Sequence, residues 1–253
     1  MAPHRLTLEQ AADFLQMDTS ELMSMAVQGE IPCQQQGKRY FFEQDALDAW
    51  CSQKIIKHSV TRKKNNDKKK KPSNPRTTVP EEAEEEPIIA QLCSEDLMET
   101  DMQAKSMPAV LKELVKLADN SGYLYDPQDL YNELHAREEE ASTAIDFGVA
   151  IPHPNRKLQI ELFSDSFICI AKLEQPIFYG SSALHNEKTD IFFLLCCLDS
   201  DLHIKLLQRI CVLCAETSLV QDLRDATSPS EMMKIITAID SDPKSFPKEQ
   251  SLS

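Results

Sequence analysis

Two histidines and one arginine are the side chains of this sequence that are best suited to chemistry. His153 ends the apolar run FGVAIPHP, where it lies between Pro152 and Pro154. Arg137 precedes it near the end of an expected helix, and His203 follows in the first turn of another. No serine or cysteine nearby is a convincing nucleophile, whereas a neutral histidine nitrogen is a good one near neutral pH. We therefore predict transfer of a phosphoryl group to the His153 imidazole.

Each of these residues has an expected role at that site. Arg137 is expected to offer a planar fork of donors to the phosphoryl oxygens, and His203 to add a second donor or hold the geometry. The prolines would restrict the backbone and help to hold His153 near the surface. Two alternatives stay open: a structural histidine at a strand end, and a histidine that is phosphorylated only as a signal. The presence of Arg137 and His203 favours the phosphate acceptor.

The elements that must position these residues alternate between helix and strand over residues 88 to 240. Apolar residues at helical spacing predict helices from residue 110, from Asp126 or Pro127, and over 203–216 and 229–239. The continuous apolar runs at 166–173 and 190–198 predict central strands that are buried on both faces. This order indicates an α/β fold, a mixed sheet covered by helices.

Residues 1 to 50 predict a separate, smaller unit. Thr7 can cap a first helix, Thr19 or Ser20 can cap a second, and Gly29 ends it. Two short extended runs around Gln36 and Gly37 predict a hairpin, and residues 43–50 predict a third helix that carries Trp50. Two helices joined by a tight turn and followed by a wing make a winged helix-turn-helix.

This unit resembles the excisionase and MerR-like DNA-binding modules. In those modules the second helix enters the major groove and the wing touches backbone phosphate. The resemblance implies a set of residues that contact DNA: Thr19, Ser20, Glu21 and Ser24 in the groove, and Lys38, Arg39 and Tyr40 on the wing. Residues 1–50 nevertheless hold three basic and eight acidic side chains, a net charge of -5 that opposes a polyanion. Docking to a protein therefore stays open as the alternative.

The segment from 51 to 87 is expected to be a charged, disordered linker, and residues 241–253 a disordered tail. Residues 51–76 hold ten basic side chains and one acidic, a net charge of +9 that can compensate for the acidic module. Five glutamates follow within residues 81–86. Two interpretations stay open for the basic run: a solvated spacer, and an arm that follows nucleic-acid phosphates.

Residues 88 to 240 resemble the enzyme IIA domains of the bacterial phosphoenolpyruvate-dependent sugar phosphotransferase system, of the type shared by fructose, mannitol and nitrogen-regulatory members. The motifs that carry the likeness keep their order along the chain: REEEAST, GVAIPH, KLEQPIFYG, DIFFLLCCL, DLHIKLLQRI and SPSEMMKII. The resemblance implies that His153 is the phosphorylated histidine, Arg137 the phosphate-binding arginine and His203 the second active-site histidine. The approach to the histidine departs from the family, with Ala144 where glycine is common and a bulky Phe147 before Gly148.

Composition and charge exclude several other classes. The net charge of -14 disfavours binding to nucleic acid or anionic membrane except through the concentrated basic run. No apolar run approaches the roughly 20 residues of a membrane span, so we expect a cytoplasmic protein. The eight cysteines lie mostly in apolar contexts, which favours buried thiols, and Cys211 and Cys214 are better core residues than a metal or redox site. We expect neither a cofactor nor a bound metal.

The sequence contains no permease segment and no second phosphocarrier module, which favours a regulatory member of the family. The expected donor is a histidine phosphocarrier protein, and DNA through residues 6–76 or a regulated protein are the expected further partners. Two alternatives stay open: a transcriptional regulator whose large domain is only a sensor, and a docking protein that retains the fold without phosphate transfer.

Overall fold

The computed structural model describes residues 5–15, 17–37, 39–43, 46–47, 50, 88–140, 142–155, 159–179 and 188–245. The strands of these residues form two sheets, one of three strands near the N-terminus and one of five strands after residue 97. The predicted linker of residues 51–87 lies outside the described residues, as do residues 246–253 of the predicted tail. None of the helices in the described ranges is both long and apolar enough to cross a membrane.

The N-terminal unit begins with two helices, α1 (Leu8–Leu15) and α2 (Thr19–Gln28). Thr7 caps α1 as predicted, because its hydroxyl accepts from the Gln10 amide while the Gln10 side chain accepts from the Thr7 amide. The predicted cap of α2 was wrong: Asp18 caps this helix, and its carboxylate accepts from the Ser20 amide at 2.7 Å. A carboxylate also suits the positive end of the helix dipole, so Asp18 is the stronger cap.

The wing follows α2 and is an antiparallel hairpin of β2 (Gln34–Gln36) and β3 (Arg39–Glu43). Gly37 has a φ of 64° in its turn, as the predicted hairpin requires. On its other side β3 pairs with β1 (Arg5–Leu6), a strand too short for its pattern to predict. The buried residues of this unit form a small core: Leu6, Ala11, Ala12, Leu22, Ala26, Ile31, Phe42 and Leu47. Of the predicted third helix, residues 46, 47 and 50 are described as helical, whereas Glu43, its predicted first residue, ends β3 instead.

The large unit is built on a mixed sheet of five strands in the order β4-β7-β8-β6-β5. Its strands are β4 (Met98–Met102), β5 (Ala144–Ile145), β6 (Val149–Ala150), β7 (Phe167–Ile177) and β8 (Thr189–Cys196). The long strands β7 and β8 are antiparallel, whereas β4 runs parallel to β7 and β6 parallel to β8. The predicted mixed α/β sheet is therefore confirmed, and the two predicted apolar strands lie in its interior.

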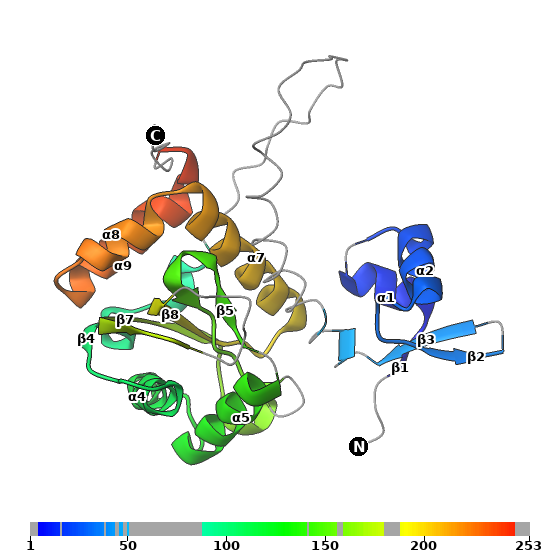
Figure 1. Cartoon of the computed structure of the whole chain (residues 1–253), viewed down its shortest axis with the longest axis horizontal. Coiled ribbons are helices and arrows are strands. Elements are labelled where there is room, and N and C mark those ends of the chain that lie inside the picture. Colours follow the sequence, from blue (N-terminus) through cyan, green and yellow to red (C-terminus); the bar gives the residue numbers. More distant parts are fainter. Residues whose placement is uncertain are drawn as a thin grey trace, which may run out of the picture.

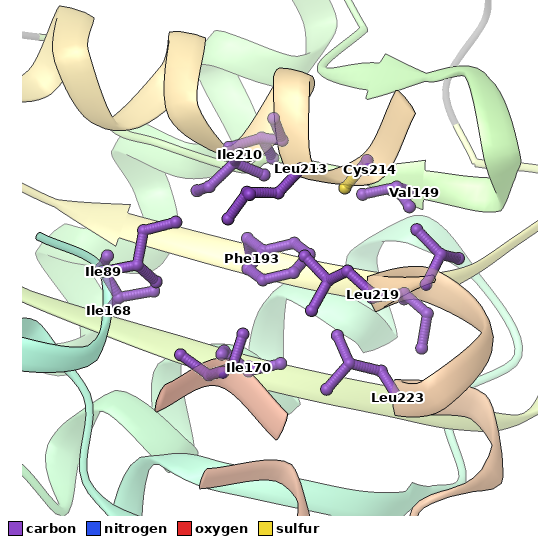
Figure 2. Packing of buried hydrophobic residues seen from close by; sticks show 14 of the residues in the cluster. Ile89, Val149, Ile168, Ile170, Phe193, Ile210, Leu213, Cys214, Leu219 and Leu223 are labelled. Atoms are coloured by element: carbon purple, nitrogen blue, oxygen red, sulfur yellow. The ribbon is translucent and has the colours of Figure 1, made fainter. Parts of the chain in front are cut away.

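Helices cover both faces of this sheet (Figure 1). One face packs against α7 (Ser200–Glu216), α8 (Leu219–Asp225) and α9 (Pro229–Ser241), and the other against α4 (Met107–Asp119), α5 (Pro127–Glu140) and α6 (Gln159–Leu162). Alternate residues of each strand serve the two cores: Ile168 and Ile170 of β7 face α7 to α9, while Cys169 and Ala171 face the opposite layer. Figure 2 shows the first core, in which Phe193 of β8 lies among side chains of α7 and α8.

The strand β4 and the helix α8 were not predicted from the sequence. β4 is an edge strand with only Met98 and Met102 buried, so it lacks the continuous apolar run of β7 and β8. Helix α8 has seven residues, too few to establish a helical period. Short 3-10 turns join the larger elements at Ala90–Leu92, Glu95–Leu97, Asp146–Gly148 and Pro243–Ser245.

A buried carboxylate ties the start of this unit to its end. Asp240 is fully buried and accepts hydrogen bonds from the amides of Ile89 and Ala90 at 2.8 and 3.1 Å. The Arg209 guanidinium of α7 donates to the same carboxylate at 3.0 Å. Because three donors converge on one buried charge, α7, α9 and the entering chain hold a common position.

Candidate active site

His153 follows β6 in the chain and lies near the end of the neighbouring strand β8. The chain is fixed there from both sides, because the Ile151 amide donates to the Thr143 carbonyl at 3.0 Å and the Leu195 amide donates to the Pro152 carbonyl at 2.9 Å. Pro152 and Pro154 have no amide proton, so neither residue can donate a backbone hydrogen bond to these two carbonyls. The backbone before His153 is thus held by Thr143, just before β5, and by Leu195 of β8.

His203 lies beside His153, as its place in the first turn of α7 predicted. The Asp199 carboxylate accepts from the Leu202 amide and fixes the start of this helix. The two imidazole rings have centroids 5.1 Å apart and planes inclined by 64°. His203 is fully buried. Its ring therefore lies beside His153 in the interior of the domain.

Arg137 reaches the same site from the last turn of α5. Its side chain is 2% exposed, and its charge acts on the His153 ring. Arg137, His153 and His203 come from three different elements, and the fold brings all three together. A cation and two imidazoles thus lie close together, and side chains of these types can bind an anionic group.

His153 itself is buried, with 3% of its surface exposed, so the expectation of a histidine near the surface was wrong. Pro152 and Pro154 are buried as well. Burial, followed by the charge of Arg137 and by His203, lowers the pKa of His153 well below its usual value of 6.5. The imidazole is therefore neutral at neutral pH.

The geometry also selects the tautomer of that neutral ring. The Nδ1 atom of His153 lies 2.8 Å from the Ile151 carbonyl oxygen. A carbonyl oxygen only accepts, so Nδ1 carries the proton and donates it. Nε2 consequently has the lone pair, so it is the nitrogen of this ring that can act as a nucleophile.

A buried polar cluster beside Arg137 was not predicted from the sequence. Glu138 is 3% exposed, and its carboxylate accepts from the Thr143 amide at 3.1 Å and from the Thr143 hydroxyl at 2.6 Å. Burial raises the pKa of Glu138, while the Thr143 hydrogen bonds and the charge of Arg137 oppose that rise. Tyr179 lies near enough for the negative charge of Glu138 to add to burial in raising the pKa of its phenol. A sequence signal existed: Leu130, Leu134 and Glu138 recur every four residues on the buried face of α5.

The turn that leads into β6 has an unusual backbone. Phe147 has a φ of 73°, in the left-handed region that bulky residues rarely adopt, and Gly148 has a φ of 74°. The Arg224 guanidinium donates to the Phe147 carbonyl at 2.6 Å and to both carboxylate oxygens of Asp190. A Cβ atom at Gly148 would lie 2.6 Å from that guanidinium, so the turn needs glycine there. This clamp holds the bulky Phe147 in a conformation that glycine usually provides.

The residues predicted to contact DNA are placed less uniformly. Thr19, Ser20 and Ser24 are exposed on α2, and Arg39 is exposed on β3. Tyr40 is partly buried against the small core of the unit, and Lys38 lies outside the described residues. The basic run of residues 54–76, on which the predicted phosphate contacts depend, lies outside them too.

The described ranges contain no cluster of three or more histidine, cysteine, aspartate or glutamate side chains that could hold a metal ion. Cys211 and Cys214 are buried in the core between α7 and the sheet, where they pack as small apolar side chains. This placement agrees with the prediction that the pair belongs to the core.

The low pKa of His153 predicts a dependence of stability on pH. Between pH 6.5 and the lower pKa of the folded state, the unfolded chain binds a proton at His153 and the folded chain does not. Acidification through this window should therefore lower the free energy of unfolding, by at most about 1.4 kcal/mol per pH unit from this group. Urea unfolding at about pH 7 and about pH 5.5 measures the change.

His153→Gln is the control for this effect, since it removes the titrating ring from the same buried position. Its free energy of unfolding should fall less between the two pH values than that of the wild-type protein. Equal losses in the two proteins would contradict a neutral imidazole at His153.

Two family models match parts of this chain. A family model described as "Phosphoenolpyruvate-dependent sugar phosphotransferase system, EIIA 2" matches residues 91–239, and one described as "Helix-turn-helix domain" matches residues 5–54. The PTS system fructose-specific EIIABC component of Bacillus subtilis is 24% identical over 154 residues, which are 60% of this chain and 23% of that protein. The chain thus spans about a quarter of the length of this curated relative.

Two solved structures share the fold. The nitrogen regulatory protein IIA-Ntr of Neisseria meningitidis has a TM-score of 0.51 at 20% identity, over 59% of this chain and 99% of that one. Enzyme IIA mannitol of Escherichia coli, solved in complex with phosphorylated enzyme IIB mannitol, has a TM-score of 0.50 at 12% identity, over 58% of this chain and 97% of that one. At these identities the likeness establishes the mixed α/β fold.

Proposed function

This chain belongs to the EIIA 2 family of the phosphoenolpyruvate-dependent sugar phosphotransferase system, and on that premise we propose that it accepts a phosphoryl group on His153. The observation that carries the proposal is the neutral, buried His153 ring, whose Nδ1–H donates to the Ile151 carbonyl and leaves Nε2 as the nucleophile. His203 lies beside that ring, and the charge of Arg137 acts on it from α5.

The transfer step balances without a cofactor. The Nε2 lone pair of His153 attacks phosphorus in a phosphohistidine donor, the new N–P bond forms as the donor's N–P bond breaks, and the donor imidazole leaves with the bonding electron pair. The positive charge that develops on the His153 ring is spread onto Nδ1–H and stabilised by the Ile151 carbonyl. The acceptor carbonyl therefore becomes more favourable as the reaction proceeds.

Arg137 acts on the transferred group. Its guanidinium offers parallel donors to the phosphoryl oxygens, whose negative charge is largest as the group passes between nitrogens. His203 lies in the first turn of α7, and the amide dipoles at this end of the helix favour the same negative charge. These groups are already fixed by the fold before the donor arrives, which lowers the cost of reorganisation.

The donor is a histidine phosphocarrier protein, as for other members of the family. Phosphorylated enzyme IIB accompanies the Escherichia coli mannitol protein in its solved complex, so an acceptor of that class is a second partner to test. The chain is incubated with the phosphocarrier, its kinase and phosphoenolpyruvate, and acid-labile phosphate is counted. We expect one phosphoryl group per chain, and none would contradict the proposal.

Because the chain also has an N-terminal helix-turn-helix domain, the phosphoryl group can serve as a signal to that domain. A phosphoryl group adds about 1.5 to 2 negative charges at neutral pH, which changes the attraction of a charged chain for its partners. Residues 51–76 carry a net charge of +9, and they join the phosphate-accepting domain to a module whose α2 face is exposed. The proposed output is DNA binding that responds to the state of His153.

This output predicts a DNA affinity that depends on salt. The full chain should bind duplex DNA at low ionic strength, with a salt slope set by the basic run. Deleting residues 54–76 should remove most of that slope, and Arg39→Gln should weaken binding by a smaller amount. Titration by fluorescence anisotropy at several salt concentrations measures both. No binding at low salt would favour a protein partner for the module instead.

A further inference from the structure

Glu138 is a buried carboxylate with no role in the transfer step. It lies in the last turn of α5, next to Arg137, and is 3% exposed. Carboxylates are rarely buried unless their oxygens are satisfied, and those of Glu138 are bound by the amide and the hydroxyl of Thr143. The shortest of these bonds, from the hydroxyl, is 2.6 Å. Glu138 therefore fixes the chain at Thr143.

Thr143 is connected in turn to the phosphate acceptor. Its carbonyl accepts from the Ile151 amide at 3.0 Å, and the Ile151 carbonyl accepts from Nδ1 of His153 at 2.8 Å. Between these contacts, β5 and β6 pair in antiparallel register, with Ala144 opposite Ala150. The Glu138 carboxylate and the His153 imidazole are thus the two ends of one continuous set of hydrogen bonds.

We propose that Glu138 is a positioning residue for His153: by holding Thr143 it places the Ile151 carbonyl, which orients the imidazole and keeps its proton on Nδ1. This inference rests on the proposed function of His153. Both carboxylate oxygens of Glu138 accept from Thr143, so Glu138 acts through the segment that it holds.

The effect of losing this carboxylate follows from the bonds that it accepts. Without an acceptor at residue 138, the Thr143 amide and hydroxyl are left buried without their partner, and the segment must shift to satisfy them. A shift at Thr143 moves the Ile151 carbonyl through their shared hydrogen bond. Catalytic groups tolerate displacements of only about 0.5 Å, so the rate of transfer should fall even though His153 remains.

Four variants of the full chain separate this role from others. Glu138→Ala removes the acceptor, whereas Glu138→Gln keeps an oxygen that can accept from Thr143 but removes the charge. Thr143→Val removes the hydroxyl and tests the same link more mildly. Glu140→Ala, an exposed position in the same turn of α5, is the matched control. Circular dichroism confirms that each variant is folded.

Two measurements are made on every variant. Imidazole nitrogen shifts of histidine-labelled protein, assigned with His153→Gln, report which nitrogen of His153 carries the proton. Single-turnover phosphoryl transfer, followed by rapid quench at several phosphocarrier concentrations, gives the maximal transfer rate (kcat) and the half-saturating phosphocarrier concentration (KM). We expect Glu138→Ala to give a mixture of tautomers and to lower kcat by about 10-fold to 100-fold with KM unchanged. Thr143→Val should shift both in the same direction by less, and Glu138→Gln and Glu140→Ala should resemble the wild-type protein.

The proposal is overturned if Glu138→Ala keeps both the Nδ1–H tautomer and the wild-type kcat. It is also overturned if Glu140→Ala changes the tautomer and kcat as much as Glu138→Ala does. If Glu138→Ala does not fold, Thr143→Val decides: an unchanged tautomer there overturns the proposal. A wild-type protein that accepts no phosphoryl group refutes the proposed function alone, because the tautomer measurement still tests the role of Glu138.

Discussion

Replacing His153 with glutamine should abolish acceptance of a phosphoryl group by this chain. Glutamine has a similar volume and can still donate to the Ile151 carbonyl, but it has no nucleophilic nitrogen. The measurement is acid-labile phosphate after incubation with the phosphocarrier, its kinase and phosphoenolpyruvate. We expect one group per wild-type chain and no signal above background in the variant.

His135→Gln is the matched control for this result. His135 lies on α5, two residues before Arg137, and its side chain is 30% exposed, so it is accessible to a donor but stands outside the site. This variant should incorporate phosphate as the wild-type protein does. Retained phosphate in His153→Gln, or its loss in His135→Gln, would assign the acceptor to a different residue.

Replacing Arg137 should leave the acceptor in place but slow the transfer. Arg137→Gln removes the donors that face the phosphoryl oxygens, and losses of this kind cost about 10²-fold to 10³-fold in rate. Arg137→Lys keeps the positive charge that favours the ionised form of Glu138, but it loses the planar guanidinium with its parallel donors. Its rate of transfer should therefore be intermediate. Rapid-quench measurement of phosphate incorporation gives the rates.

The same substitution should also change the titration of His153. The charge of Arg137 is the second cause that lowers the pKa of His153, after burial. In Arg137→Gln the imidazole should therefore protonate at a higher pH than in the wild-type protein, as followed by its NMR shifts. Lys205→Gln, which removes an exposed charge from α7, is the control and should alter neither rate nor titration. A wild-type rate in Arg137→Gln would remove this residue from the proposed site.

The architecture was predictable where burial imposes a simple pattern. The strands β7 and β8 are buried on both faces, so both appear in the sequence as unbroken apolar runs. β4 lies at the edge of the sheet, where Asp101 is exposed, and its pattern is therefore no different from that of a loop. Position within the sheet decided which strands could be recognised.

The site was predictable in its residues more than in its environment. The resemblance named Arg137, His153 and His203, and the fold brings these three together. The burial of His153 was missed because prolines on both sides indicate an irregular segment, whereas its depth depends on the helices and strands that pack around it. Such packing joins residues far apart in the chain, and local patterns do not record it.

For Glu138, the sequence could indicate burial but not the contact that the side chain makes. Three consecutive glutamates follow Arg137, and composition alone makes them equivalent. The spacing of Leu130 and Leu134 singles out Glu138 as the one on the buried face, but its bond to Thr143 requires the chain to turn back after α5. Helical period could therefore identify the residue, whereas its contact needed the structure.

The proposed function is tested most directly by locating the phosphoryl group on the protein. Phosphorus and nitrogen NMR of the histidine-labelled chain, after incubation with the phosphocarrier mixture, identifies the nitrogen that is bonded to phosphorus. The account predicts a single phosphoramidate at Nε2 of His153, with the proton on Nδ1. A phosphoryl group on Nδ1 or on another residue would contradict it, as would no phosphoryl group in a mixture that phosphorylates another member of the family.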